Sequence, residues 1–144
     1  MSGSGGGGSS DCACFNLQRA ARLVAQAYDR RLRPTGLTNT QLSVLAVAAR
    51  GPVSIGDLAR SLGAERTTVT RNLQLMERRG LVRLAAGCDG RTKAVEVTPK
   101  GRRQYAAAET VWREAQSRIV AALGADWRPL VRGLRRVAEV SEAL

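Results

Sequence analysis

Apolar residues recur along this chain at the spacing of amphipathic helices. Three segments, residues 11–33, 99–123 and 126–144, place side chains that are apolar at all but one position alternately three and four residues apart. That rhythm puts each set on one stripe of a helix. The stripes are Cys14, Leu17, Ala21, Val24 and Tyr28; then Tyr105, Ala108, Trp112, Ala115, Ile119 and Ala122; and finally Trp127, Leu130, Leu134, Val137, Ser141 and Leu144.

Capping and breaking residues mark where the helices begin and end. Ser, Thr and Asp side chains accept hydrogen bonds from the first free N–H groups of a helix, whereas Gly and Pro end one. The expected N-caps are Thr38, Ser54, Thr98 and Asp126, and the expected stops are Pro34, Gly36, Gly51, Gly63, Gly80 and Gly124. These marks also predict a helix over residues 38–49.

The middle of the chain combines two short helices with a hairpin. Helices are predicted at residues 55–62 and 64–79, and short strands at 81–84 and 94–97. The loop between the strands, residues 85–93, is rich in glycine and charge. A short helix, a tight turn, a polar helix and then a hairpin is the order of a winged helix-turn-helix. The expected fold class is therefore mainly α, an α+β winged helix.

One domain accounts for the chain after a short linker. Residues 1–10 have the glycine and serine composition of a flexible linker or tag, so they are left out of the fold. Residues 11–144 suffice for a single domain. Within it, residues 38–98 form the expected DNA-binding region. The stripes at 11–33 and 99–144 have few other elements to cover, so we expect dimerisation helices that pack across a two-fold axis. A bundle within one chain is the alternative.

The charge balance favours an anionic partner. The chain has 23 Lys and Arg against 12 Asp and Glu, a net charge of +11, and its only lysines are Lys93 and Lys100. Such an excess favours nucleic acid or an acidic membrane surface. Arginine pairs bidentately with phosphate and with guanine, which favours nucleic acid, here double-stranded DNA. A merely soluble basic protein is the plain alternative.

Missing residue types narrow the function further. The chain has no histidine, and we find no phosphate loop, no nucleophile–base pair and no metal-ligand cluster, so an enzyme is not expected. Its three cysteines form no disulfide framework. No apolar run approaches the roughly 18 residues of a membrane span. We therefore expect a cytoplasmic protein with free thiols, no cofactor and no membrane contact.

Polar residues on the second helix of the motif are the candidates for reading DNA. They interleave with the apolar Val69 and Leu73, and Thr and Arg side chains suit base edges and phosphates in a major groove. A solvated amphipathic face is the common alternative, but residues 60–103 hold 11 basic residues and 4 acidic ones. The candidates are Arg66, Thr67, Thr68, Thr70, Arg71 and Gln74.

Three stretches carry a family likeness. They are LTNTQLSVL at residues 37–45, ERTTVTRNLQLMERRGLV at 65–82 and DGRTKAVEVT at 89–98. The last fits a wing pattern D-x-R-x(6)-T, with Val97 in place of the usual leucine before the threonine. Together they resemble the multiple-antibiotic-resistance regulator (MarR) family of bacterial winged-helix proteins. The resemblance covers nearly the whole chain after the linker and implies a mostly helical, triangular homodimer.

The resemblance also gives the wing residues a role. It implies that Arg91 enters the minor groove and that Asp89 orients it; Lys93 joins them as a DNA-binding candidate. Narrow A/T-rich minor grooves attract arginine electrostatically. An ordinary turn with a surface ion pair is the alternative, and such pairs contribute little energy.

The first helix adds a candidate sensing site. Cys14 is followed by Phe15, and Tyr28 lies fourteen residues further on. Fourteen residues at 100° each return to within about 40°, so Cys14 and Tyr28 share one helix face. This resembles the organic-hydroperoxide-sensing branch of the same family, in which a tyrosine at this position hydrogen-bonds a reactive cysteine. The chain departs from that branch at Gln18, where a second tyrosine is expected.

Other roles for the cysteines stay open. A sulfenic acid at Cys14 would condense with a second thiol, either Cys12, Cys88 or a thiol of the other subunit. Cys12 and Cys14 form a C-x-C pair that a soft metal or metalloid could use, although residues two apart on a helix point about 200° apart. Free cysteine also often packs as a small apolar residue.

The sequence as a whole predicts a DNA-binding transcriptional regulator. We expect a ligand- or redox-responsive repressor that binds a pseudo-palindromic operator as a homodimer, with a small molecule or an oxidant as its effector. One alternative is a soft-metal- or metalloid-responsive regulator that uses Cys12 and Cys14. The other is a nucleic-acid-binding protein with no sequence preference.

Overall fold

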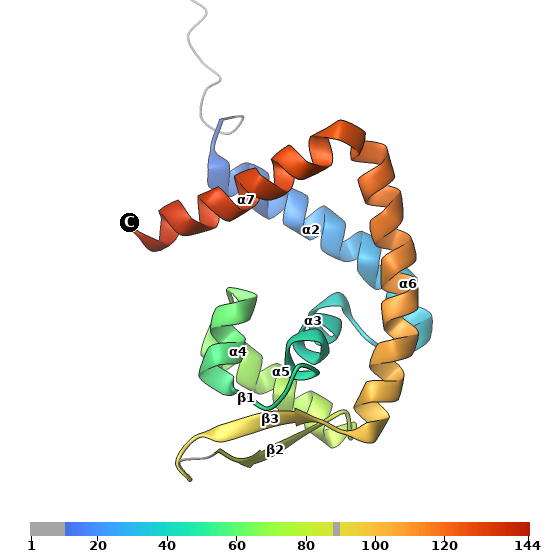
Figure 1. The fold of residues 1–144 in the computed structure, drawn as a ribbon, viewed down its shortest axis with the longest axis vertical. Helices are drawn as coiled ribbons and strands as arrows, with labels where there is room; N and C mark the ends of the chain where they lie inside the picture. Colours follow the sequence, from blue (N-terminus) through green and yellow to red (C-terminus); the bar gives the residue numbers. More distant parts are fainter. Residues whose placement is uncertain (1–10, 88–89) are drawn as a thin grey trace, which may run out of the picture.

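A winged-helix head joined to long helices makes up the computed structural model, which describes residues 11–87 and 90–144 (Figure 1). In Figure 1, α2 and α7 cross the top, α6 runs down one side, and the head with its sheet lies below. The predicted mainly α winged-helix fold is confirmed. The elements in chain order are α2 (Ala13–Leu32), η1 (Arg33–Thr35), α3 (Asn39–Ala48), β1 (Val53–Ser54), α4 (Ile55–Leu62), α5 (Arg66–Arg78), β2 (Val82–Ala86), β3 (Lys93–Val97), α6 (Pro99–Leu123), η2 (Gly124–Asp126) and α7 (Trp127–Glu142).

A three-stranded antiparallel sheet closes the head and extends into the wing. Its strand order is β1-β3-β2, and β2 pairs with β3 from Val82 opposite Val97 to Ala86 opposite Lys93. The predicted hairpin is present, with strands slightly longer towards the wing than expected. Strand β1 has no counterpart in the sequence prediction, because two residues are too few to show an alternating pattern.

Three of the four predicted N-caps are confirmed. Thr38, Ser54 and Thr98 each accept a hydrogen bond from a backbone N–H in the first turn of their helix, at 3.0 to 3.2 Å. Asp126 is a correction. Its backbone is already helical and its side chain caps nothing, because the 3-10 turn η2 runs directly into α7. Helix α5 begins at Arg66, two residues later than predicted.

The core fills the head and continues up the inner face of α6. It is built from Leu, Val and Met side chains contributed by every helix of the head and by the sheet, as the low aromatic content requires. The largest fully buried side chains are Leu32, Val44, Leu45, Leu58, Leu73, Met76, Leu81, Val82 and Val95.

The three apolar stripes lie in different surroundings. The stripe of α6 packs within the protomer, against α2 and α3, with Ala108 and Ala115 buried. Much of this stripe is therefore covered within the protomer, and its packing across a two-fold axis stays a prediction for the part that is not. Helix α2 is buried only near its end, at Tyr28 and Leu32. Helix α7 has no buried residue, so its stripe is uncovered in the protomer and does not form a bundle within the chain.

Candidate nucleic-acid interface

Helices α4 and α5 form the predicted helix-turn-helix. Gly63, with a φ of +60°, ends α4 in the left-handed conformation that favours glycine. Its N–H donates to the Arg60 carbonyl at 3.2 Å, and the Ala64 N–H donates to the Ala59 carbonyl at 3.0 Å. This tight turn lets buried Leu58 and Val69 pack in one core. The polar face of α5 is consequently directed outward.

Five of the six reading candidates on α5 share one hollow. It has a volume of about 450 Å³ and is lined by Arg66, Thr67, Thr70, Arg71 and Gln74. No carboxylate among the described residues pairs with either arginine. Two guanidinium groups, two hydroxyls and an amide therefore face solvent together, and these are the groups that contact phosphates and base edges in a major groove.

Thr68 lies apart from the other five. It lines a separate hollow of about 390 Å³ between α3, α4 and α5, together with Ser43, Leu62 and Asn72. Successive helical residues point about 100° apart, so a residue next to the reading face in sequence can lie beyond its edge. The placement favours the five clustered residues as the reading set.

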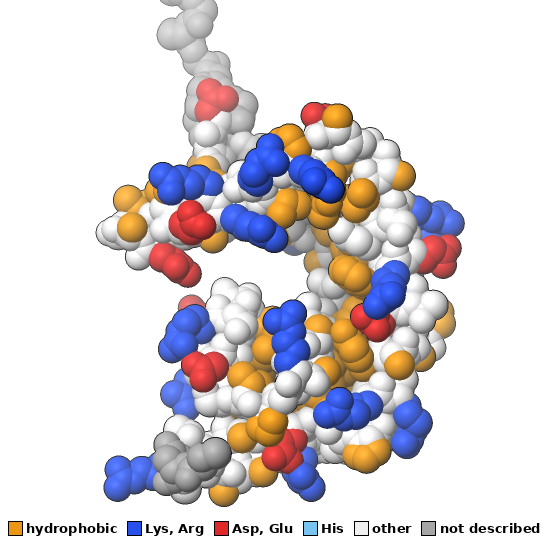
Figure 2. All heavy atoms as spheres, viewed as in Figure 1, with side chains coloured by type: hydrophobic (Ala, Val, Ile, Leu, Met, Phe, Trp, Pro, Cys, Tyr) orange, Lys and Arg blue, Asp and Glu red, His pale blue; other side chains and the backbone are white. Residues whose placement is uncertain are grey.

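The wing carries exposed basic side chains. Arg91 and Lys93 are both exposed, with Lys93 at the start of β3, whereas Asp89 and its predicted orienting role lie outside the described residues. Further down the hairpin, the carboxylate of Glu96 binds the guanidinium of Arg83 and raises the pKa of that arginine. Basic groups (blue) occur over the wing end of the molecule in Figure 2.

A glutamate that the sequence prediction did not single out links the wing to α5, which we call the reading helix because it carries the candidate DNA-reading residues. The carboxylate of Glu77, in the last turn of α5, accepts a hydrogen bond from the Leu84 N–H of β2 at 3.0 Å. Thr98 strengthens the same junction, because its N–H donates to the Leu81 carbonyl at 3.1 Å. A single acidic residue near a helix end has no distinctive sequence pattern, so the contact between Glu77 and Leu84 could be found only from the structure.

Two of the predicted sensing cysteines lie at the start of α2. Cys12 occupies the N-cap with an extended backbone, and Cys14 lies in the first turn. Both are exposed free thiols, so neither packs as a core residue in the protomer. Because Cys12 precedes the helix, the 200° separation expected within a helix does not apply to the pair. Among the described residues, no cluster of three or more potential ligands could hold a metal ion. Cys88 lies outside the described residues.

Tyr28, the fourth sensing candidate, is engaged elsewhere in the protomer. Its hydroxyl donates to the side-chain oxygen of Gln116, and its ring stacks on Trp112 with centroids 6.4 Å apart. Burial raises the pKa of Tyr28. Fourteen residues along a helix span about 21 Å, so Tyr28 cannot reach Cys14 of its own chain. The predicted hydrogen bond would require Tyr28 of another copy.

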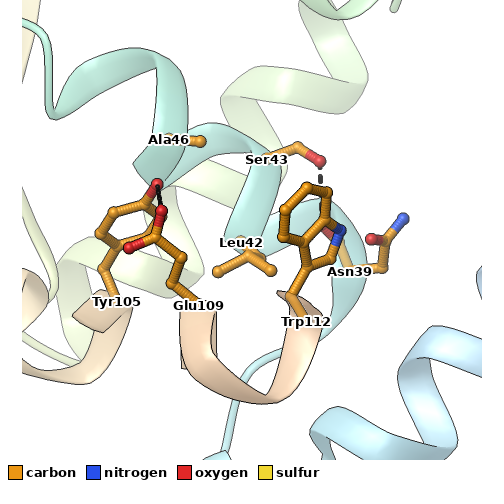
Figure 3. A pocket seen from close by; sticks show the side chains of 7 residues that line it. All are labelled: Asn39, Leu42, Ser43, Ala46, Tyr105, Glu109 and Trp112. Atoms are coloured by element: carbon orange, nitrogen blue, oxygen red, sulfur yellow. Dashed lines mark hydrogen bonds between the residues drawn. The ribbon is translucent and has the colours of Figure 1, made fainter. Parts of the chain in front are cut away.

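A smaller hollow lies between α3 and α6 (Figure 3). Its volume is about 150 Å³, and Tyr105 and Trp112 of α6 face α3 across it. The Tyr105 hydroxyl donates to Glu109 at 3.5 Å, and burial, reinforced by the nearby Glu109 charge, raises the pKa of Tyr105. The remaining lining residues are Asn39, Leu42, Ser43 and Ala46. Typical small-molecule sites measure about 300–1,000 Å³, so this hollow is smaller than most of them.

No helix within residues 11–87 and 90–144 has the length and apolarity needed to cross a membrane.

Comparisons with known proteins give consistent matches. The family model that matches residues 35–92 is described as the MarR family. The transcriptional regulator MosR of M. tuberculosis, solved in complex with DNA, is 47% identical with a TM-score of 0.85 and is matched over 92% of this chain and 98% of its own. CouR from Rhodococcus jostii RHA1, solved with p-coumaroyl-CoA, is 26% identical with a TM-score of 0.74, over 93% of this chain and 94% of its own.

A curated relative from Bacillus subtilis (strain 168) matches more narrowly. It is the uncharacterized HTH-type transcriptional regulator YwoH, 33% identical over 90 residues. That match covers 62% of this chain and 66% of the relative, just under two thirds of its length. MosR and YwoH are named as transcriptional regulators and CouR as a transcriptional repressor, the class of protein that the sequence predicts.

Proposed function

Because this chain belongs to the MarR family of transcriptional regulators, we propose that it represses transcription by binding a pseudo-palindromic operator as a homodimer and releases the operator on oxidation. The hollow on α5 is the observation that carries the proposal. Its five polar residues, two of them arginines with no described carboxylate partner, form a surface that recognises DNA rather than a small substrate. The matched MosR structure contains DNA, which supports the same partner for this chain.

Uncovered apolar surface supports the homodimer. Phe15, Leu23 and Val24 on α2 are 42–50% exposed, and Leu130 and Leu134 on α7 are 43–44% exposed. Figure 2 shows a notch between the upper helices and the head, with hydrophobic side chains along its inner wall. Exposed apolar side chains gathered on two helices mark an association site. In a dimer with a two-fold axis, the second copy would cover these residues of α2 and α7 with its own α2 and α7 residues.

Specific DNA binding is tested with a duplex that the protein selects from a random-sequence pool. We expect one dimer per duplex, with half-sites about one helical turn apart. Arg66, Arg71, Arg91 and Lys93 in each copy would displace condensed counterions, so the affinity should fall by about 10³–10⁵ between 50 and 200 mM salt. Fluorescence polarisation measures both the number of dimers bound per duplex and the salt dependence of the affinity. Equal affinity for a scrambled duplex would favour the alternative of binding without sequence preference, and an affinity insensitive to salt would refute the interface.

The exposed thiols at the start of α2 favour an oxidant as effector. Cys14 would take one oxygen atom from a hydroperoxide and leave an alcohol, and the resulting sulfenic acid would condense with the Cys12 thiol, releasing water. Both side chains are accessible to the reagent, and Cys12 lies outside the helix, where its backbone can adjust. A disulfide between Cys12 and Cys14 would distort the first turn of α2, which lies on the proposed dimer face. This distortion would shift the winged-helix heads of the two copies relative to each other.

One equivalent of an organic hydroperoxide tests this response. We expect the parent to lose operator affinity and Cys14→Ser to keep it, with Cys12→Ser halting at the sulfenic acid. Peptide mass spectrometry after proteolytic digestion identifies the oxidised residue in each sample. Full affinity of a parent whose Cys14 is shown to be oxidised would refute redox sensing. Oxidation at Cys12 or Cys88 with Cys14 unmodified would refute the residue assignment.

The α3–α6 hollow favours a second candidate effector. Its aromatic wall and its volume of about 150 Å³ suit a small planar molecule, and it is too small for a whole acyl-CoA such as the ligand in the CouR structure. Salicylate, as a simple planar probe, should quench the fluorescence of Trp112 and weaken operator binding. A Trp112→Phe variant serves as the fluorescence control, because Trp127 is then the only indole. Unchanged emission at millimolar salicylate would refute this candidate.

A further inference from the structure

A cluster of hydrogen bonds around Arg79, which we call the Arg79 node, joins three segments that are far apart in the sequence. Arg79, the C-cap of α5, donates from Nη2 to the Gly36 carbonyl at 2.7 Å and from Nη1 to the Gln41 side chain at 3.3 Å. From α6, Lys100 Nζ donates to the Arg79 carbonyl at 2.7 Å, and Gln104 Nε2 donates to the Thr35 carbonyl at 3.0 Å. The end of the reading helix, the turn after α2 and the start of α6 therefore meet at one point.

The node is packed as well as hydrogen-bonded. Gly36 has a φ of +76°, and a Cβ there would lie 3.0 Å from Gln104 Nε2 and 3.4 Å from Arg79 Nη2. The Gln41 oxygen that receives Arg79 also accepts the Thr38 N–H of the α3 capping box at 3.2 Å. A guanidinium with donors on both edges fits two acceptors at once, which a lysine ammonium on a flexible stem does less well.

We infer that Arg79 is a positioning residue that fixes the angle of the reading helix relative to α2 and α6, the helices that connect the head to the proposed dimer face. This inference rests on the proposed function. Arg79 lies beyond the last turn of α5, away from the hollow formed by Arg66 and its neighbours, so it acts through α5 rather than by touching DNA.

The length of α5 makes the angle matter. Its 13 residues span about 20 Å. A tilt of about 10° at Arg79 would displace the opposite end, which begins the reading face, by roughly 3.5 Å, close to the 3.4 Å rise of one base pair. A loosened node would therefore blur the half-site spacing that a dimer can recognise, without removing any DNA contact.

The test varies the spacing of the selected duplex by one base pair in either direction. The variants are Arg79→Lys, which keeps the charge, and Gln104→Leu, which removes a different bond of the node; Arg135→Lys on the exposed face of α7 is the matched control. Both node variants should bind the original spacing about five- to tenfold more weakly. Their loss of affinity on altered spacings should be smaller than the parent's, and the salt slope should not change. Arg135→Lys should match the parent.

Two outcomes would overturn the inference. Equal weakening on all spacings would indicate a merely structural role. In a further variant, Arg79→Ala, a salt slope lowered by about two, one contact in each copy, would indicate that Arg79 contacts phosphate directly. Hydrogen exchange separates this inference from the proposed function. Arg79→Lys should speed exchange at residues 36–41 and 76–81 whether or not the parent selects a duplex, and unchanged exchange there would refute the node on its own.

Discussion

Gly101 offers the sharpest test of how the head is fixed to α6. It lies buried in the first turn of that helix, where an added Cβ would come 2.0 Å from the Leu81 carbonyl oxygen and 2.9 Å from a Val97 methyl group. Carbon and oxygen atoms normally stay about 3.3 Å apart, so the chain would have to separate by more than about 1 Å. The Leu81 oxygen cannot yield freely, because it accepts the Thr98 N–H at 3.1 Å and the Thr98 hydroxyl at 3.2 Å.

The expected cost of Gly101→Ala follows from three opposing effects. Overpacking of this kind costs about 1–3 kcal/mol, and weakening the hydrogen bonds to Leu81 adds about 1 kcal/mol. Alanine is favoured over glycine inside a helix by about 1 kcal/mol, which offsets part of the loss. We therefore expect the free energy of unfolding to fall by about 1–3 kcal/mol.

Gly56→Ala is the matched control, because Gly56 also lies in a helix but no atom would lie within 4 Å of its new Cβ. This variant should gain about 0.5–1 kcal/mol. Urea denaturation followed by circular dichroism measures the free energy of unfolding of both variants. All samples are compared at one protein concentration, because dimerisation makes the midpoint concentration-dependent. A Gly101→Ala protein as stable as the parent, or two variants shifted in the same direction, would refute the close approach.

Other substitutions probe the interface and the long helices. Arg91→Ala should weaken operator binding by roughly 1–3 kcal/mol while the fold survives, as polarisation and circular dichroism would show; parental affinity would disprove the wing assignment. Arg71→Ala should weaken binding to all duplexes alike if the arginine holds phosphate, with a salt slope lower by about two, because the dimer loses one contact in each copy. Leu134→Arg should convert dimer to monomer in sedimentation velocity, and an unchanged dimer would place the association surface elsewhere. Tyr28→Phe should lower unfolding stability by about 1 kcal/mol, because Gln116 loses its donor; no change would show that water replaces it.

Local patterns were enough to predict the head. Caps such as Thr38 and Ser54 act through contacts three residues away, so the sequence around them contains the whole interaction. The same holds for the left-handed turn at Gly63. Reading residues were predicted for a similar reason, since polar positions on α5 interleave with buried ones. Thr68 marks the limit, because its neighbours on α3 and α4 decide which hollow it lines.

Long-range packing could not be predicted from periodicity. A stripe shows that one helix face is apolar, but the stripes of α6 and α7 look alike in the sequence while only that of α6 packs within the protomer. Arg79 is one of several arginines near the end of α5, and its partners Gly36 and Gln41 lie 43 and 38 residues away. No local pattern singles it out.

The hydrogen bond between Glu77 and Leu84 of β2 couples the orientation of the reading helix to that of the wing. Along a duplex, the offset between a major groove and the adjacent minor groove changes with helical twist. If the reading helix and the wing are coupled, the head fits one offset between the two grooves best. Underwound or overwound DNA would then strain either the major-groove or the minor-groove contact. Under the proposed function, the superhelical stress of a promoter would thus adjust how firmly the protein holds its operator, independently of any oxidant or ligand.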